Sequence, residues 1–193
     1  MREIIHELYS EEQIHARVQE LAAQINQDYE GKSLHVICIL KGSVYFCCEL
    51  TKYLTMPVTL DFMAVSSYGN GMKSSGRLRI TKDLDEDIDD LHCLIVEDII
   101  DSGSTIKMTK DLLSARNAAS MKVCALLDKP SCRETEVSID YIGFEIPDQF
   151  VVGYGLDYAQ KYRNLPYIAS VEIVEEMPPV PDDINGSGTV SVE

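Results

Sequence analysis

The chain contains 193 residues, 45% of them hydrophobic and 25% charged, which suits a single domain with a buried core. Its formal charge is 17 − 32 = −15, and two segments carry most of it: residues 82–101 hold nine acids and one base, and residues 172–193 hold six acids and no base. Such a surface repels phosphate backbones and anionic lipid heads, so we expect no nucleic-acid and no membrane partner. The sequence has neither an apolar run near the ~20 residues of a membrane-spanning helix nor a secretory signal, which predicts a cytoplasmic protein.

The apolar pattern predicts helices and strands that alternate over the first two thirds of the chain. Residues 10–29 place apolar side chains at spacings of three and four behind Ser10, which predicts an amphipathic helix with Ser10 as its N-cap. Further helices are predicted at residues 44–54 and 105–115. Mostly apolar runs predict strands at residues 34–40, 58–65, 77–81, 91–96 and 123–127, followed by β-rich segments around 141–144, 150–154 and 168–173.

This alternation is typical of an α/β fold with a mostly parallel sheet. We expect residues 1–176 to form one domain, and residues 177–193 have the Pro, Gly and acidic content of a disordered acidic tail. Residues 66–76 are rich in Ser and Gly, which predicts a mobile loop. Three of the six cysteines lie within predicted strands and no C-x-x-C pair occurs, so we expect reduced packing residues and no zinc site.

The segment LIVEDIIDSGST, residues 94–105, is the most informative motif. A buried strand delivers Glu97 and Asp98 at its carboxyl end, where ligands bind in an open α/β sheet. Backbone N–H groups of residues 102–105 then open a helix, where they can form a nest for a phosphate monoester, and Gly103 permits close approach. The lysine of a Walker A loop is missing, which disfavours nucleoside triphosphate hydrolysis. The alternative is a simple helix cap beside two solvated strand-end charges.

Residues 94–105 resemble the phosphoribosyl diphosphate (PRPP) binding motif of type I phosphoribosyltransferases, although Ser102 stands where many relatives have Thr. LKGS at residues 40–43 is similar to the pyrophosphate loop of that family, and SSYG at residues 66–69 to the start of its lid. DKP at residues 128–130 and GFEIPDQFVVGYGLDYAQKYRNLPYI at residues 143–168 resemble the base-binding part of bacterial hypoxanthine-guanine phosphoribosyltransferases. The first motif is shared by adenine, uracil and orotate enzymes, whereas the last two are specific for 6-oxopurine members.

The resemblance implies the type I phosphoribosyltransferase fold: a central, mostly parallel twisted sheet flanked by helices, a small β-rich hood that includes residues 143–168, and a flexible lid loop at residues 66–76. It also implies a reaction, the Mg²⁺-dependent transfer of the 5-phosphoribosyl group from PRPP to N9 of hypoxanthine or guanine. The products would be IMP or GMP and pyrophosphate, which is purine salvage chemistry.

The resemblance further implies the residues that bind PRPP. Glu97 and Asp98 would face the ribose hydroxyls and one Mg²⁺ ion, and Asp157 would hold a second ion on the pyrophosphate side; its alternative is an ordinary loop acid. Mg²⁺ is a hard cation that prefers such oxygen ligands. We expect a cis peptide bond between Leu40 and Lys41. The phosphate would be bound by Ser102, Gly103, Ser104 and Thr105, and the pyrophosphate by Lys41, Gly42 and Arg163.

The purine-binding residues implied by the resemblance are Lys129, Phe150, Val151 and Asp157. The Lys129 ammonium would donate to O6 of the purine, which adenine lacks, so adenine should be a poor substrate. Phe150 would stack on the ring, although an aromatic residue is more often part of the core. Asp101 would be catalytic, with its carboxylate near N7 of the purine as N9 attacks; its alternative is the N-cap of the following helix.

The resemblance gives the loop at residues 66–76 a purpose, since Ser67 and Tyr68 would close over the site and exclude water; its alternative is a hairpin connection without a role. Two other functions stay open. One is a xanthine-preferring phosphoribosyltransferase. The other is a PRPP-sensing transcriptional regulator, which needs a basic face that the net charge of −15 disfavours. By analogy with relatives, we expect a homodimer or homotetramer.

Overall fold

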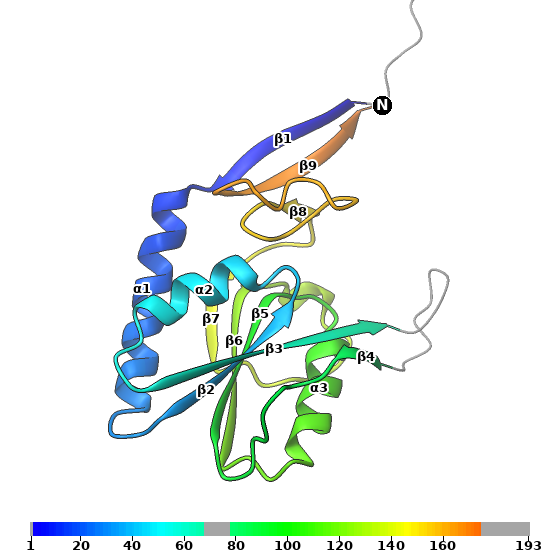
Figure 1. Ribbon diagram of the computed structural model, residues 1–193. Coiled ribbons are helices and arrows are strands. Elements are labelled where there is room, and N and C mark those ends of the chain that lie inside the picture. The colour runs from blue at the N-terminus through cyan, green and yellow to red at the C-terminus, as the bar shows by residue number, and fades with distance from the viewer. Residues whose placement is uncertain (1, 68–77, 175–193) are drawn as a thin grey trace, which may run out of the picture.

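The computed structural model describes residues 2–67 and 78–174, which form two β-sheets (Figure 1). The larger sheet has six strands in the order β4-β3-β2-β5-β6-β7. Their bounds are β2 Leu34–Leu40, β3 Val58–Ser67, β4 Leu78–Lys82, β5 His92–Ile100, β6 Ser120–Asp128 and β7 Tyr141–Glu145. Neighbours in this sheet are parallel except for β3 and β4, which are antiparallel. The predicted mostly parallel α/β sheet is therefore confirmed.

Helices cover both faces of this sheet, with α1 (Glu11–Asp28) and α2 (Val44–Lys52) on one face and α3 (Ser104–Ser114) on the other (Figure 1). Alternate residues of the strands point to opposite faces. Val36 and Val96 belong to the core cluster that includes α1 and α2, whereas Ile37 and Ile95 belong to the cluster that includes α3. Because both faces are buried, these strands read as nearly continuous apolar runs.

The predicted N-cap of α1 is confirmed at Ser10. Its hydroxyl accepts a hydrogen bond from the Gln13 N–H, and the Gln13 side chain accepts one from the Ser10 N–H at 2.9 Å, which is a capping box. The predicted apolar stripe is buried: Ile14, Val18, Leu21, Ala22 and Ile25. Most predicted bounds shift by a residue or two, and the largest difference is at β5, which continues to Ile100. The strand continues because Glu97 and Ile100 still pair with Ala125 and Asp128 of β6.

The smaller sheet lies beyond one end of the larger sheet (Figure 1) and consists of β1 (Arg2–Tyr9), β9 (Ile168–Val174) and β8 (Val151–Val152), in the antiparallel order β1-β9-β8. This is the predicted hood, but its composition differs from the prediction. Residues 143–145 belong to β7 of the larger sheet, and the hood takes β1 from the opposite end of the chain. The predicted strand at residues 150–154 shrinks to β8, because Gly153 and Gly155 turn the backbone at φ 92° and 101°.

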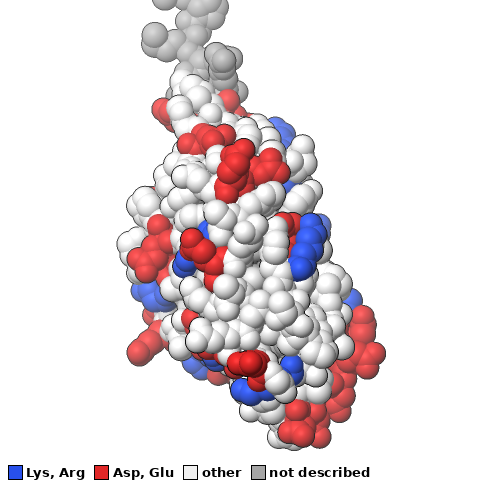
Figure 2. Space-filling model, turned by 90° about the vertical axis from the view of Figure 1, so that its left-hand side faces the viewer, with Lys and Arg blue, Asp and Glu red and all other residues white. Residues whose placement is uncertain are grey.

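Two predicted features fall largely outside the described residues. Ser67 ends β3 opposite Leu78 of β4, but Tyr68 and the rest of the predicted lid up to residue 76 are not described, and neither is the predicted tail at residues 177–193. Within the two described ranges, no helix is long and apolar enough to cross a membrane. Figure 2 shows acidic side chains in a dense group at the lower end of one face, with lysine and arginine scattered among other side chains.

Candidate active site

The carboxyl ends of four neighbouring parallel strands bring the predicted site residues together. Lys41 follows β2, Asp101 follows β5, Lys129 follows β6 and Phe150 lies in the segment after β7. These strands are adjacent in the order β2-β5-β6-β7, so the loops that follow them lie along one edge of the sheet. Ligands bind at this edge in open α/β folds.

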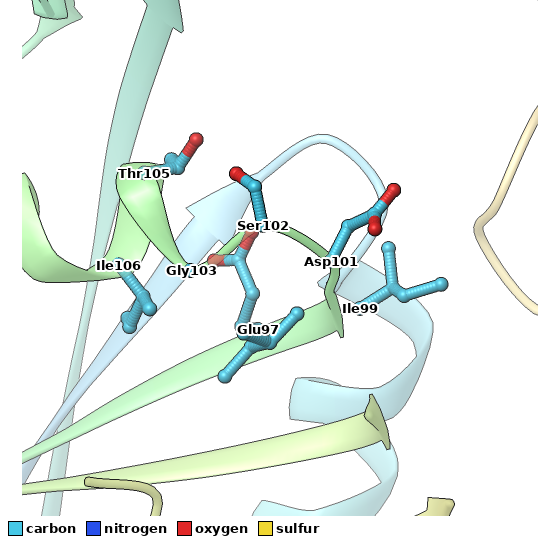
Figure 3. A pocket seen from close by; sticks show the side chains of 8 residues that line it. Glu97, Ile99, Asp101, Ser102, Gly103, Thr105 and Ile106 are labelled. Atoms are coloured by element: carbon cyan, nitrogen blue, oxygen red, sulfur yellow. The ribbon is translucent and has the colours of Figure 1, made fainter. Parts of the chain in front are cut away.

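The loop between β5 and α3 surrounds a small pocket of about 90 Å³ (Figure 3). Gly103, at φ 84°, is the residue before the first turn of α3, and the Ser104 N–H donates to Ser102 Oγ at 3.3 Å. The helix N-terminus therefore opens beside the pocket, as an anion-binding loop requires. The pocket is lined by Glu97, Ile99, Ile100, Asp101, Ser102, Gly103, Thr105 and Ile106.

Glu97 extends from β5 toward the Ser102–Gly103 side of this loop (Figure 3). Its Oε2 atom is buried and has no hydrogen-bond partner within the part of the chain that the structure describes. Burial, reinforced by the negative charge of Asp98, raises the pKa of Glu97 well above its ordinary value. Buried polar atoms are nearly always paired, so this unpaired oxygen is a candidate ligand-binding atom.

Asp98 faces away from Glu97, because successive residues of a strand point to opposite sides. It lies against the loop after β2: a Cβ atom on Gly42 would lie 1.5 Å from Asp98 Oδ2, so any side chain at position 42 would displace this carboxylate. Burial raises the pKa of Asp98 to about 6, opposed in part by the Ile99 N–H and by Arg163. The two acids of the motif thus serve two different loops.

The loop after β2 has the predicted cis peptide bond between Leu40 and Lys41. Lys41 is exposed, and Gly42 is buried beneath the hood segment that contains Gly155. In that segment the Arg163 guanidinium pairs with Asp157 at 2.5 Å and donates to the Gly155 carbonyl at 2.7 Å. Asp157 is therefore an ion-paired residue next to the predicted pyrophosphate loop and not a solvated loop acid.

Lys129 is buried at the predicted base site, with 8% of its side chain exposed. Its ammonium lies 3.5 Å from Asp148 Oδ1 and 4.0 Å from Asp101 Oδ2. Phe150 is 53% exposed and makes an edge-to-face contact with Tyr158, with ring centroids 5.5 Å apart, so the core alternative for Phe150 is wrong. Val151 is buried in β8.

Asp101 does not cap α3, because the N-cap position belongs to Gly103 and the Ser104 N–H at that helix end donates to Ser102 Oγ. The Asp101 side chain is 59% exposed at the rim of the pocket. The N-cap alternative for Asp101 is therefore wrong, and its carboxylate is free to contact a ligand.

Comparison with known proteins fits this geometry. The model of the phosphoribosyl transferase domain family matches residues 5–159. The chain belongs to this family. The phosphoribosyltransferase is 52% identical over 171 residues to the hypoxanthine phosphoribosyltransferase of Haemophilus influenzae, which covers 87% of this chain and 96% of the relative. It is 49% identical over 161 residues to the hypoxanthine-guanine phosphoribosyltransferase of Bacillus subtilis, covering 83% of this chain and 89% of the relative.

A solved structure agrees with these relatives. The hypoxanthine-guanine phosphoribosyltransferase of Bacillus anthracis superposes with a TM-score of 0.83 at 47% identity, covering 86% of this chain and 98% of the other. The resemblance inferred from the motifs and the type I phosphoribosyltransferase fold are both confirmed. The chain is an enzyme of the phosphoribosyltransferase class.

The sequence interpretation missed several residues of this phosphoribosyltransferase site. The backbone N–H groups of Glu134 and Thr135 both donate to the Ser102 carbonyl at 3.0 Å, and Arg133 donates to the Asp101 carbonyl. Asp148, the acid nearest Lys129, was also missed. The available signals were weak: Asp148 lies two residues before Phe150 in the quoted segment, and Arg133 lies four residues after Lys129.

The candidate metal ligands of this phosphoribosyltransferase suit a Mg²⁺ ion that is also bound by the substrate. They do not suit a site in which protein side chains supply all the ligands. Among the described residues, no three His, Cys, Asp or Glu side chains converge on one metal position. Mg²⁺ in proteins keeps several waters and is commonly held by one or two carboxylates plus substrate oxygens. The unpartnered Oε2 of Glu97 and the carboxylate of Asp98 are hard oxygen donors of this kind.

A charge-removing substitution at Glu97 should stabilise the metal-free phosphoribosyltransferase. At pH 8 we expect Glu97→Gln to raise the free energy of unfolding by about 1–3 kcal/mol, because the buried charge has no partner. Because the pKa of Glu97 is raised in the folded state, ionisation of this carboxyl destabilises the native protein as the pH rises above about 4.5. The stability gained by Glu97→Gln should therefore grow above this pH and vanish below it. Urea unfolding of Glu97→Gln and of the exposed control Glu136→Gln between pH 4 and pH 8 tests this. A loss of stability at pH 8, or an equal gain in the control, would contradict it.

Proposed function

We propose that this phosphoribosyltransferase transfers the 5-phosphoribosyl group from PRPP to N9 of a 6-oxopurine, hypoxanthine or guanine, and releases pyrophosphate. The observation that carries this proposal is the position of Lys129: its buried ammonium lies 4.0 Å from Asp101 of the phosphate loop and 3.5 Å from Asp148, two residues before the exposed Phe150. The relatives that are 52% and 49% identical to this chain are named hypoxanthine and hypoxanthine-guanine phosphoribosyltransferases, which supports the same substrate class.

Base selection follows from the chemistry of Lys129. An ammonium only donates hydrogen bonds, so it matches the O6 acceptor of hypoxanthine or guanine and opposes the amino group of adenine. Asp148, 3.5 Å away, forms an ion pair with this buried group. The Phe150 ring offers a face on which a purine can stack.

Proton transfer falls to Asp101. As N9 of the purine attacks the anomeric carbon and the bond from that carbon to pyrophosphate breaks, the ring acquires positive charge. A carboxylate near N7 stabilises this charge and takes the N7 proton, which leaves the purine of the product neutral. Asp101 projects from the rim of the pocket at 4.0 Å from the Lys129 ammonium, so one purine can reach both side chains.

The leaving pyrophosphate carries negative charge that cations must neutralise. Because the protein is acidic overall, these cations must lie at the binding site itself. Lys41, at the end of β2, and Arg163, beside Gly155, supply fixed positive charge at the pyrophosphate side. Because Glu97 and Asp98 leave β5 on opposite sides, they would face the ribose hydroxyls and one Mg²⁺ ion partly through water. Asp157 would hold a second ion if Arg163 releases it. When bound, Mg²⁺ neutralises charge on the phosphate oxygens.

A steady-state assay with PRPP, Mg²⁺ and four purines tests the proposal. We expect turnover with hypoxanthine and guanine, a kcat/KM for adenine lower by about 10⁴-fold, and loss of turnover on addition of EDTA that excess Mg²⁺ restores. Preference for xanthine would favour the xanthine-specific alternative. Absence of turnover together with tight RNA binding would favour a PRPP-sensing regulator.

The cellular setting is part of the same proposal. All six cysteines are free and four are buried, which suits the reducing cytoplasm. A homodimer or homotetramer stays a prediction, which sedimentation of the purified chain would test.

A further inference from the structure

Arg133 connects the phosphate loop after β5 to the end of β6, next to Lys129. The proposed function gives this residue no role. The 3-10 turn Pro130–Cys132 begins directly after Lys129 and turns the chain back toward the phosphate loop. Arg133, the next residue, donates from Nη1 to the Asp101 carbonyl at 2.7 Å and from Nη2 to the Asp128 carboxylate. One guanidinium thus holds the residue before Lys129 and the backbone of Asp101.

Backbone contacts strengthen the same connection. Glu134 and Thr135 donate to the Ser102 carbonyl, and Thr135 Oγ1 lies 3.2 Å from Ser104 Oγ. A Cβ atom on Gly103 would lie 2.6 Å from the Thr135 carbonyl oxygen and 3.0 Å from Arg133 Cδ, so the two segments are in close packing contact. Residues 133–135 therefore form a brace along the outside of the phosphate loop.

The ion pair of this brace is largely removed from water. The side chains of Arg133 and Asp128 are 18% and 7% exposed. A buried carboxylate that loses its cationic partner is strongly destabilising, whereas a planar guanidinium can satisfy two acceptors in fixed directions. A lysine in its place has no planar pair of donors, so the geometry depends on arginine and not on charge alone.

We infer that Arg133 is a positioning residue of the transfer reaction: it fixes the backbone of Asp101 against Asp128, so that the proton-handling carboxylate and the Lys129 ammonium keep one spacing for the purine. This inference rests on the proposed function for the roles of Asp101 and Lys129. Both terminal nitrogens of Arg133 are bonded to protein groups, so the guanidinium acts through Asp101. A displacement of about 1 Å at a reacting group costs up to about 100-fold in rate.

The test separates positioning from stability. Arg133→Gln alone leaves Asp128 as an unpaired buried charge, so the main variant is Arg133→Gln combined with Asp128→Asn, which replaces the ion pair by two neutral amides. Asp128→Asn alone is its reference. Arg133→Lys is the conservative variant. Arg116→Gln is the matched control, because Arg116 forms a partly exposed ion pair with Asp83, at 2.8 Å, away from the site.

For each variant we would measure the melting temperature, kcat and KM with hypoxanthine and PRPP, and hydrogen–deuterium exchange of the peptide that contains residues 101–105. We expect the double variant to melt near its Asp128→Asn reference, to lose kcat by about 10- to 100-fold, and to exchange faster in this loop. Arg133→Lys should recover stability and only part of kcat, and Arg116→Gln should match the native enzyme in kcat and loop exchange.

Native kcat and native loop exchange in a folded double variant would overturn the inference, even if its melting temperature fell. Full recovery of kcat in Arg133→Lys would also overturn it, since charge alone would then suffice. If the native chain turned over no purine, the proposed function would fail, and the exchange of residues 101–105 would still decide whether Arg133 orders this loop.

Discussion

Replacing Asp101 with alanine is expected to lower kcat with hypoxanthine by about 10²- to 10⁴-fold while leaving the melting temperature within about 2 °C of the native value. The side chain is 59% exposed and caps no helix, so its removal takes little from the folded state. The loss of rate follows from the loss of a pocket-rim acid that also faces Lys129. Asparagine at this position should be similarly impaired, since an amide keeps the shape but not the charge.

Steady-state kinetics and thermal unfolding of the same preparations check this expectation. Asp89→Ala is a suitable control, because it removes one negative charge from the exposed acidic turn between β4 and β5. A melting temperature that falls while kcat stays native would assign Asp101 to structure and leave proton handling to another group.

The larger sheet could be predicted from the sequence because both of its faces are buried. In runs such as residues 34–40, alternate residues enter the cluster of α1 and α2 and the cluster of α3. Every position except His35 is therefore apolar, which makes the strand conspicuous. The N-cap at Ser10 was predicted equally well, since a cap is recognised from residues next to it in sequence; the capping box with Gln13 was found only in the structure.

The hood could not be predicted in the same way. Arg2–Tyr9 mixes charged and apolar residues without a clean alternation, and it becomes a strand because it pairs with β9 from the other end of the chain. Such pairing depends on the tertiary structure and is invisible to a local pattern. β8 was overestimated for the opposite reason: Val151–Val152 is apolar, but Gly153 leaves the strand at positive φ.

The candidate site shows the same division between local and non-local information. The motif indicated Glu97 and Asp98 as a pair, but the strand directs them to opposite faces, so that Glu97 lies beneath the phosphate loop and Asp98 against Gly42. The brace formed by residues 133–135 has no sequence signature, because its contacts to residues 101 and 102 are made mostly by the backbone.

Replacing Gly155 with alanine should have the largest effect on folding among the glycine positions of the site. A Cβ atom at Gly155 would lie 1.9 Å from the Gly42 carbonyl oxygen and 3.0 Å from the Gly42 carbonyl carbon, and backbone atoms cannot rotate away as a side chain can. The residue also has φ of 101°, which disfavours any L side chain. Together, strain and overpacking should lower the free energy of unfolding by about 4 kcal/mol.

Gly31→Ala separates the two causes. Gly31 also has positive φ, at 74°, but a Cβ atom there would meet nothing within 4 Å, so its substitution should cost only about 1 kcal/mol of backbone strain. Gly155 lies against Gly42 of the predicted pyrophosphate loop. Any Gly155→Ala protein that folds should therefore have a KM for PRPP raised by about tenfold or more. Gly31→Ala should keep the native KM. Urea unfolding and PRPP titration of both variants measure this. Equal stability losses would attribute the effect to φ alone, and a native KM in folded Gly155→Ala would show that the hood does not hold the loop in place.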